Sequence, residues 1–289
     1  MSKVSYFLRQ LFRPNSGLPS VNMCYSAEST GIDRERWNSL SGKSFWITGG
    51  GTGFGQSIAL CLASAGSRVF VSGRRGQKLQ ETVDTLVRSG LPGSVCIPVI
   101  MDLSNPADIE NACTVVSRSC PDGLDGLINC AALPERAGPT PLSSATVTYW
   151  DSMMAVNLRA PWLVSRSMAA IMAKTGMIRI LNMTSTAGWA GTAGVGLYNI
   201  TKAALNNLTM SLAEELALIY EEAHVQVNAV DPGQARTEMN QGSSENPDSI
   251  LPLVIKLLTY PNNGPNGKFF HKDGRFLDFG FSTPFEKEL

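Results

Sequence analysis

Short apolar runs alternate with longer amphipathic stretches from residue 44 towards the C-terminus. Short runs rich in β-branched residues predict buried strands, and longer stretches with one apolar face predict helices. The predicted strands cover 44–48, 68–72, 95–101, 124–129, 177–183, 225–230 and 268–271. The predicted helices cover 56–65, 78–88, 106–119, 150–174, 198–220 and 249–258. Gly66 and Pro106 agree with these bounds, because glycine is favoured just after a helix and proline in its first turn.

This alternation of strands and helices predicts an α/β fold with one parallel sheet covered on both faces. Because crossovers between parallel strands are right-handed, we expect a Rossmann-type doubly wound sheet of about seven strands. We expect a single catalytic domain over residues 41–289, preceded by an N-terminal extension over residues 1–40. Ligands of such sheets bind at the carboxyl ends of the strands, so the loops that follow the strands are where chemistry is expected.

Composition narrows the classes of function. Of 289 residues, 43% are apolar and 17% charged, and 24 Lys and Arg balance 24 Asp and Glu. This balance gives no basic footprint for nucleic acid. The six cysteines form no C-x-x-C pair and there are two histidines, so we expect neither a metal site nor a disulfide framework. Reduced thiols favour a cytoplasmic protein, and no apolar run is long enough to predict a membrane span.

The first residues are basic and apolar, and leave two interpretations open. Lys3, Arg9 and Arg13 precede the first acid, Glu28. Residues 1–25 could therefore be a mitochondrial targeting peptide. Alternatively, residues 1–40 are a poorly ordered extension or an arm that packs on a neighbour, which the composition favours.

A glycine-rich loop follows the first strand. It reads T-G-G-G-T-G-F-G from Thr48 to Gly55 and leads into the first predicted helix. Glycines let the backbone turn sharply and approach a pyrophosphate, and the N-terminus of the helix offers free N–H groups and a partial positive charge. A turn without a ligand also uses glycines, but the place between strand and helix favours dinucleotide binding.

The end of the second strand indicates which dinucleotide. An NAD site usually has an acid about twenty residues beyond the glycines. Here no acid lies between Gly55 and Glu81, and the strand ends at Arg74 and Arg75. A guanidinium suits a 2′-phosphate, so the sequence favours NADP(H), with Arg74 the better candidate. NAD(H) remains the alternative, in which both arginines are merely solvated.

Tyr198 and Lys202 stand four residues apart and therefore share one face of a helix. We expect the ammonium to lower the pKa of the phenol, so that it can exchange a proton with a carbonyl or alcohol oxygen. A surface pair is the competing interpretation. Ser185 follows the strand 177–183, where its hydroxyl can bind the same oxygen, with Thr184 and Thr186 as rivals.

The T-G-x-x-x-G-x-G loop and the Y-x-x-x-K pair resemble the short-chain dehydrogenase/reductase family, from about residue 40 to the C-terminus. The resemblance implies a catalytic tetrad of Asn157, Ser185, Tyr198 and Lys202, with Asn157 helping to hold a water that links Lys202 to solvent. The Asn-Cys-Ala-Ala at 129–132 departs from the family's Asn-Asn-Ala-Gly, and Asp102 is either an adenine contact or a turn acid. The implied cofactor residues are Gly49, Thr52, Gly53, Phe54, Gly55, Arg74, Asp102, Leu103, Asn129, Tyr198, Lys202, Pro232, Gly233 and Thr237.

The prediction is thus an NADP-dependent oxidoreductase that moves hydride between nicotinamide and a small carbonyl or secondary alcohol. A sensor or scaffold that binds NADP(H) without turnover is the alternative. The substrate walls are expected from 133–142, 186–197 and 238–250, the last polar and typical of a mobile loop. Arg136 and Arg236 are candidates to pair an acidic substrate. Family members usually pair through their two long helices, here 150–174 and 198–220, which implies a homodimer or homotetramer.

Overall fold

Strand β1 (Ser44–Thr48) lies inside the sheet, and its side chains alternate between two hydrophobic cores. The computed structural model describes residues 25–134, 142–191 and 194–277. Phe45 and Ile47 belong to one core, whereas Trp46 belongs to the other. The buried indole of Trp46 donates a 3.1 Å hydrogen bond from Nε1 to Oγ of Ser72 on the next strand. A strand buried on both faces is apolar along nearly its whole length, which is why the apolar run in the sequence could identify it.

Within the part of the chain that the structure describes, seven parallel strands form the sheet, as predicted, and an eighth short antiparallel strand closes one edge. The order is β3 (Cys96–Ile100), β2 (Arg68–Gly73), β1, β4 (Gly126–Asn129), β5 (Met177–Met183), β6 (His224–Asp231), β7 (Phe269–His271) and β8 (Phe276–Leu277). The chain runs outward from β1 to β3 and then returns to the other side of β1. The reversal leaves a crevice at the carboxyl ends of β1 and β4, where doubly wound sheets bind ligands.

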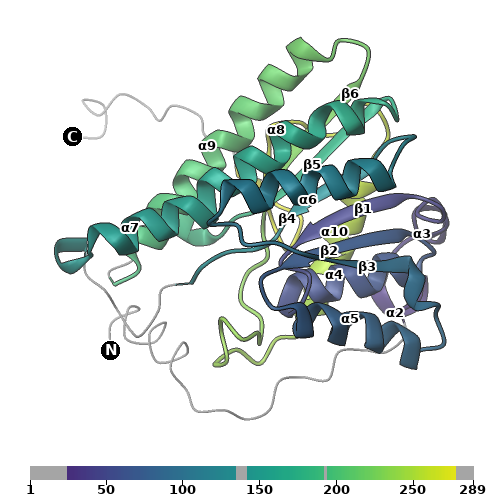
Figure 1. Ribbon diagram of the computed structural model, residues 1–289, viewed down its shortest axis with the longest axis horizontal. Coiled ribbons are helices and arrows are strands. Elements are labelled where there is room, and N and C mark those ends of the chain that lie inside the picture. Colours follow the sequence, from purple (N-terminus) through teal and green to yellow (C-terminus); the bar gives the residue numbers. More distant parts are fainter. Residues whose placement is uncertain (1–24, 135–141, 192–193, 278–289) are drawn as a thin grey trace.

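Helices cover both faces of the sheet (Figure 1). One face carries α4 (Gly53–Ser64), α5 (Gly76–Arg88) and α10 (Leu251–Leu258). The other carries α6 (Pro106–Ser119), α8 (Ala160–Ala173) and α9 (Gly196–Ile219). Short 3₁₀ turns at Gly93–Val95, Leu142–Ser144, Thr186–Gly188 and Pro247–Ile250 join these elements. Within the described ranges, none of the helices combines the length and apolar character needed to cross a membrane.

The single helix predicted over 150–174 is interrupted, which corrects the prediction. Helix α7 (Val147–Met154) continues into a π-helical turn at Ala155–Arg159 before α8 begins. Pro161 has no backbone N–H, so the carbonyl of Asn157 cannot receive the bond that an α-helix would give it. The turn therefore widens at a functionally predicted residue, as π-bulges often do.

Residues 25–40, which the sequence assigns to the N-terminal extension, pack on the chain's own core. They form α2 (Ala27–Thr30) and α3 (Arg34–Asn38). Tyr25, Ile32 and Leu40 are buried in the core that contains α4 and α10. The targeting interpretation covers residues 1–25 and the arm interpretation residues 1–40; residues 1–24, common to both, lie outside the described residues.

Candidate active site

A cavity of about 660 Å³ opens at the carboxyl ends of β1 to β6. Its walls are the loops that follow these strands, together with the first turns of α4 and α9. Most of the predicted site residues line it: Gly49, Thr52, Gly53, Phe54, Gly55, Arg74, Asp102, Leu103, Ser185, Tyr198, Lys202, Pro232, Gly233 and Thr237. Two predicted residues, Asn129 and Asn157, lie buried behind its wall.

The glycine-rich loop is packed so tightly that side chains would not fit. Gly49 has a φ of 74°, and a Cβ there would lie 2.8 Å from Cα of Ala131 after β4. A Cβ on Gly55 would lie 2.3 Å from the carbonyl oxygen of Gly49. The N-cap residue of α4, Thr52, makes no side-chain hydrogen bond to the first turn. The N–H groups at this helix end are therefore available to a phosphate, so the loop fits the pyrophosphate of a dinucleotide.

Basic side chains gather where β2 and β3 end. Arg74, Arg75 and Lys78 all line the cavity there. Nη2 of Arg75 lies 2.6 Å from Oε2 of Glu238, which belongs to the loop after β6. The charge of Arg74 acts on Asp102, whose carboxylate also receives hydrogen bonds from Ser104. This end of the cavity fits an anionic group such as a 2′-phosphate.

Asp102 has the environment of a turn acid as well as a place at the cavity. Its Oδ1 accepts 2.8 Å hydrogen bonds from both N and Oγ of Ser104. Partial burial raises the pKa of the Asp102 carboxyl, but these bonds and the charge of Arg74 outweigh it and lower the pKa overall. The turn interpretation is thus satisfied, while the adenine contact stays a prediction.

Tyr198 and Lys202 lie one turn apart on α9 and both face the cavity. Nζ of Lys202 lies 5.5 Å from the centroid of the Tyr198 ring and donates a 2.7 Å hydrogen bond to the carbonyl of Met183. Burial lowers the pKa of Lys202 to about 8. An ammonium held this way can direct its charge at the phenol and at a bound ribose.

The pKa of Tyr198 shifts in the direction opposite to our expectation. Burial raises it, and the negative charge of Asp231 raises it further, whereas a hydrogen bond from Ser185 lowers it in part. The prediction from the Lys202 spacing was wrong because the sequence shows neither the depth of the site nor the carboxylate beside it. The raised pKa makes Tyr198 a protonated phenol.

Thr184, Ser185 and Thr186 all line the cavity, and the hydrogen bonds of their hydroxyls distinguish them. Thr184 is buried and donates a 2.5 Å hydrogen bond from Oγ1 to Oδ1 of Asn206. Thr186 donates a 2.6 Å hydrogen bond from Oγ1 to Oδ2 of Asp231. Ser185 interacts with Tyr198 and accepts a 3.2 Å bond from the N–H of Ala187. The geometry therefore favours Ser185 over both rivals.

Asn157 is fully buried and clamps the loop after β4 to α9. Its Oδ1 accepts a 2.7 Å bond from the N–H of Leu133, and its Nδ2 donates to the carbonyl of Leu133 and to Oγ1 of Thr201. The side chain is thus committed to protein partners. Pro161 has no N–H to offer the backbone carbonyl of Asn157, and the water-holding role of Asn157 stays a prediction.

Asn129 acts within the sheet. Its Nδ2 donates to Oδ1 of Asn182 at 2.8 Å and to Oγ of Ser165 at 3.1 Å. Asn182 passes the network on to Oγ1 of Thr209 in α9. Asn129 therefore fixes β4, β5 and the helices behind them, and a direct cofactor contact stays a prediction.

The predicted wall at 238–250 lines the cavity through Glu238, Met239 and Asn240, and its later part is held by hydrogen bonds. The mobility that its composition indicates stays a prediction. Oδ1 of Asp248 accepts hydrogen bonds from Tyr25 Oη at 2.8 Å and from Ser57 Oγ at 2.5 Å. Arg236, a candidate for an acidic substrate, instead braces the loop by donating from Nε to the carbonyl of Ser243. Arg136, the other candidate, lies outside the described residues.

Two residues of the site were missed by sequence reasoning. Asp231 is 1% exposed and borders the cavity, although Asp-Pro-Gly reads as an ordinary turn. Cys130 also lines the cavity near Lys202, and burial raises the pKa of its thiol to about 12. The signal for Asp231 was its place at the end of the sixth strand, beside the loop that carries Ser185.

Comparison with known proteins places this geometry in a family. A family model described as short chain dehydrogenase matches residues 43–248. The chain belongs to the short-chain dehydrogenase/reductase family. It is 34% identical to the 3-oxoacyl-[acyl-carrier-protein] reductase FabG of Aquifex aeolicus, over 81% of this chain and 97% of that one. It is 33% identical to dehydrogenase/reductase SDR family member 4 of Bos taurus, over 73% and 72% of the two chains.

Solved structures of short-chain dehydrogenases share the fold. A dehydrogenase/reductase from Sinorhizobium meliloti 1021 is 28% identical with a TM-score of 0.71, covering 83% of this chain and 97% of that chain. A short chain dehydrogenase from Pseudomonas syringae is 26% identical with a TM-score of 0.73, covering 81% and 96%. As a short-chain dehydrogenase/reductase, the protein is an oxidoreductase of the class that acts on CH–OH and C=O groups.

Proposed function

We propose that the protein is an NADP(H)-dependent reductase or dehydrogenase that transfers hydride between nicotinamide and a small carbonyl or secondary-alcohol substrate. The observation that carries the proposal is the convergence of Tyr198, Lys202 and Ser185 on one cavity. Ser185 follows β5, whereas Tyr198 and Lys202 lie one turn apart on α9. A Tyr–Lys pair on the protein surface would not meet a hydroxyl from another part of the chain in one cavity. The catalytic tetrad is completed by Asn157.

The preference for NADP(H) rests on the basic end of the cavity. Arg74 follows β2, where a 2′-phosphate would lie, and no acid occupies the loop that leads from there into α5. A guanidinium binds a phosphate with charged, paired hydrogen bonds. Gly49, Thr52, Gly53 and Gly55 would hold the pyrophosphate, and Pro232, Gly233 and Thr237 the nicotinamide amide.

The proposed chemistry divides between the cofactor and the side chains. When bound, the nicotinamide gives or accepts the hydride. Ser185 donates a hydrogen bond to the substrate oxygen and stabilises the charge that develops on it. Tyr198 gives its proton to that oxygen during reduction, and takes it back during oxidation. The raised pKa of Tyr198 keeps the phenol protonated, which suits reduction.

Lys202 and Asn157 would return the proton to Tyr198. The Lys202 pKa of about 8 makes the ammonium a proton donor near neutral pH. Water held at the backbone carbonyl of Asn157 would connect it with solvent, because Pro161 has no N–H to donate to that carbonyl.

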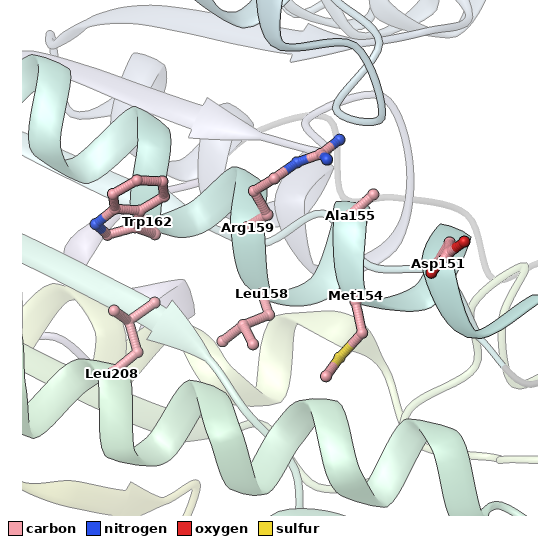
Figure 2. Close-up of a pocket in the computed structure, with 7 residues that line it drawn as sticks. All are labelled: Asp151, Met154, Ala155, Leu158, Arg159, Trp162 and Leu208. Carbon is pink, nitrogen blue, oxygen red and sulfur yellow. The ribbon is translucent and has the colours of Figure 1, made fainter. Parts of the chain in front are cut away.

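We further propose a homodimer or homotetramer that pairs through the two long helices. A groove of about 610 Å³ lies on the outer face of α7, the π-helical turn and α8, next to α9 (Figure 2). It is lined by Asp151, Met154, Ala155, Leu158, Arg159, Trp162 and Leu208. Trp162 is 39% exposed, a large apolar side chain of the kind that interfaces bury. A cytoplasmic location remains a prediction from cysteine usage.

The proposed activity is tested with the full-length protein in two steps. NADPH and NADH are first titrated by fluorescence. NADPH consumption is then followed with ethyl acetoacetate, benzaldehyde and cyclohexanone; the first is a 3-oxo ester, chosen because one relative is named a 3-oxoacyl reductase. Tight NADPH binding with turnover of a carbonyl supports the proposal. NADPH binding without turnover across a wide carbonyl panel would favour the sensor instead.

A further inference from the structure

The carboxylate of Asp231 joins two loops of the active site at the end of β6. Its Oδ2 accepts a 2.6 Å hydrogen bond from Oγ1 of Thr186, the residue after Ser185. Its Oδ1 accepts a 2.9 Å hydrogen bond from the N–H of Gly233. The first loop carries the hydroxyl proposed to bind the substrate oxygen, and the second the turn proposed to hold the nicotinamide. One buried side chain thus sets the distance between the two reactants' binding groups.

Asp231 also places a negative charge beside Tyr198 and Lys202. Burial raises the pKa of Tyr198 and Asp231 raises it further; burial lowers the pKa of Lys202 to about 8, and Cys130 and Asp231 oppose that fall. The Cys130 thiol has a pKa raised by burial to about 12, so it is uncharged near neutral pH. The remaining group that acts on Tyr198, Ser185, is a neutral hydroxyl. The negative charge that this pair experiences at neutral pH therefore comes from Asp231.

We propose that Asp231 is a positioning residue for hydride transfer, which holds the Ser185 loop against the nicotinamide turn. This inference rests on the proposed function, because it assigns Asp231 to the same site. It adds a direction to that function: a carboxylate beside the phenol favours the protonated donor that carbonyl reduction needs, and opposes the phenolate that alcohol oxidation needs.

Asp231 has two proposed effects: its hydrogen bonds hold the two loops together, which we call the tether, and its carboxylate supplies a charge. Two nearly isosteric substitutions separate the tether from the charge. Asp231→Asn removes the charge but keeps an oxygen for Gly233 and an amide that can bond Thr186. Thr186→Val removes the hydroxyl but leaves the carboxylate. Thr186→Ser restores the hydroxyl and serves as the matched control. For each full-length variant, NADPH affinity is measured by fluorescence, and kcat and KM for ethyl acetoacetate across pH.

The charge predicts a shift in pH dependence. Reduction needs the phenol, so its rate falls as pH rises through the apparent pKa of Tyr198. Without the negative charge this pKa is lower, so in Asp231→Asn the fall in rate should move to lower pH. In Thr186→Val it should stay where it is in the wild type. If the rate of Asp231→Asn falls at the same pH as in the wild type, or at higher pH, the charge assignment is overturned.

The tether predicts a loss of organisation without a pH shift. Thr186→Val should weaken NADPH binding by about 2- to 10-fold, the equivalent of one hydrogen bond, and Thr186→Ser should recover it. Wild-type NADPH affinity in Thr186→Val overturns the tether. If Asp231→Asn does not fold, Asp231→Glu tests the charge. In this variant the reduction rate should fall over the same pH range as in the wild type, and a fall over a different range contradicts the assignment of the charge.

Failure of this inference is distinguishable from failure of the proposed function. If the wild type consumes no NADPH with ethyl acetoacetate or any other carbonyl, the proposed function fails. The NADPH titrations of Thr186→Val and Thr186→Ser need no substrate and still decide the tether.

Discussion

Nη2 of Arg75 lies 2.6 Å from Oε2 of Glu238, so one ion pair connects the loop after β2 with the loop after β6 across the cavity. Both side chains are partly exposed, at 58% and 33%, so solvent screens the pair and its own contribution to stability is small. The ion pair matters because Glu238 competes with a 2′-phosphate for the guanidinium of Arg75.

Glu238→Gln is therefore expected to tighten NADPH binding by about 2- to 5-fold, the range of an exposed ion pair, and to leave NADH almost unchanged. Fluorescence titration at two salt concentrations measures this. An equal gain for both nucleotides would show that Glu238 acts on something other than the 2′-phosphate.

Arg74→Ala should weaken NADPH far more than NADH. A charged hydrogen bond contributes about 1.5–3 kcal/mol, which corresponds to a loss of roughly 10- to 150-fold. The same titration checks it, with Arg88→Ala on the outer part of α5 as a control for lost surface charge. Equal losses for the two nucleotides would contradict the NADP(H) preference.

Tyr198→Phe removes the proton donor and keeps the ring. Turnover of ethyl acetoacetate should fall by about 100- to 10,000-fold, the contribution typical of general acid catalysis, while NADPH affinity stays within a few-fold. Steady-state NADPH consumption and fluorescence titration measure the two effects. A variant with the wild-type rate would disprove the assigned role.

Lys202 makes the fold less stable at neutral pH. Its pKa falls from 10.5 when unfolded to about 8 when folded, so the unfolded chain binds the proton more tightly. This cost is complete below pH 8 and disappears as pH rises towards 10.5. Lys202→Met should raise the melting temperature by about 2–4 °C at pH 7, after allowance for the lost bond to Met183. The gain should shrink towards pH 10; a gain that grows with pH would contradict this account.

Leu208→Asp should dissociate the proposed oligomer, because it places a charge in the groove beside Trp162. Light scattering coupled to size exclusion reports the mass. Val87→Asp is the matched control, since Val87 is 53% exposed on α5, away from the groove. A monomeric wild type, or an unchanged mass in Leu208→Asp, would reject this interface.

The sheet could be predicted almost strand for strand, because strands buried on both faces are continuous apolar runs. Met177–Met183 matched to the residue. The π-helical turn was missed, although Pro161 was visible in the sequence, because apolar periodicity alone continues through it. Helix α4 begins three residues before the prediction, since its first turn is the glycine-rich loop itself.

The residues of the site could be predicted better than their electrostatics. Short motifs fix which side chains reach the cavity, as for Tyr198 and Lys202. The pKa of Tyr198 depends instead on burial and on Asp231, which lies at the end of β6, 33 residues away in sequence. Likewise, the bond between Thr186 and Asp231 follows from the pairing of β5 with β6, which no local pattern contains.

The hydrogen bond from Tyr25 to Asp248 reaches from outside the region shared with the family, which begins at residue 43, to the segment that continues from the cavity wall at Glu238, Met239 and Asn240. A segment that relatives need not share thus helps to hold the chain that continues from this wall. Divergence at the N-terminus could retune substrate choice without changing a residue that touches cofactor or substrate. A version of this protein trimmed to the family's common core would lose that support and should be compared with the full chain before any substrate preference is ascribed to the fold.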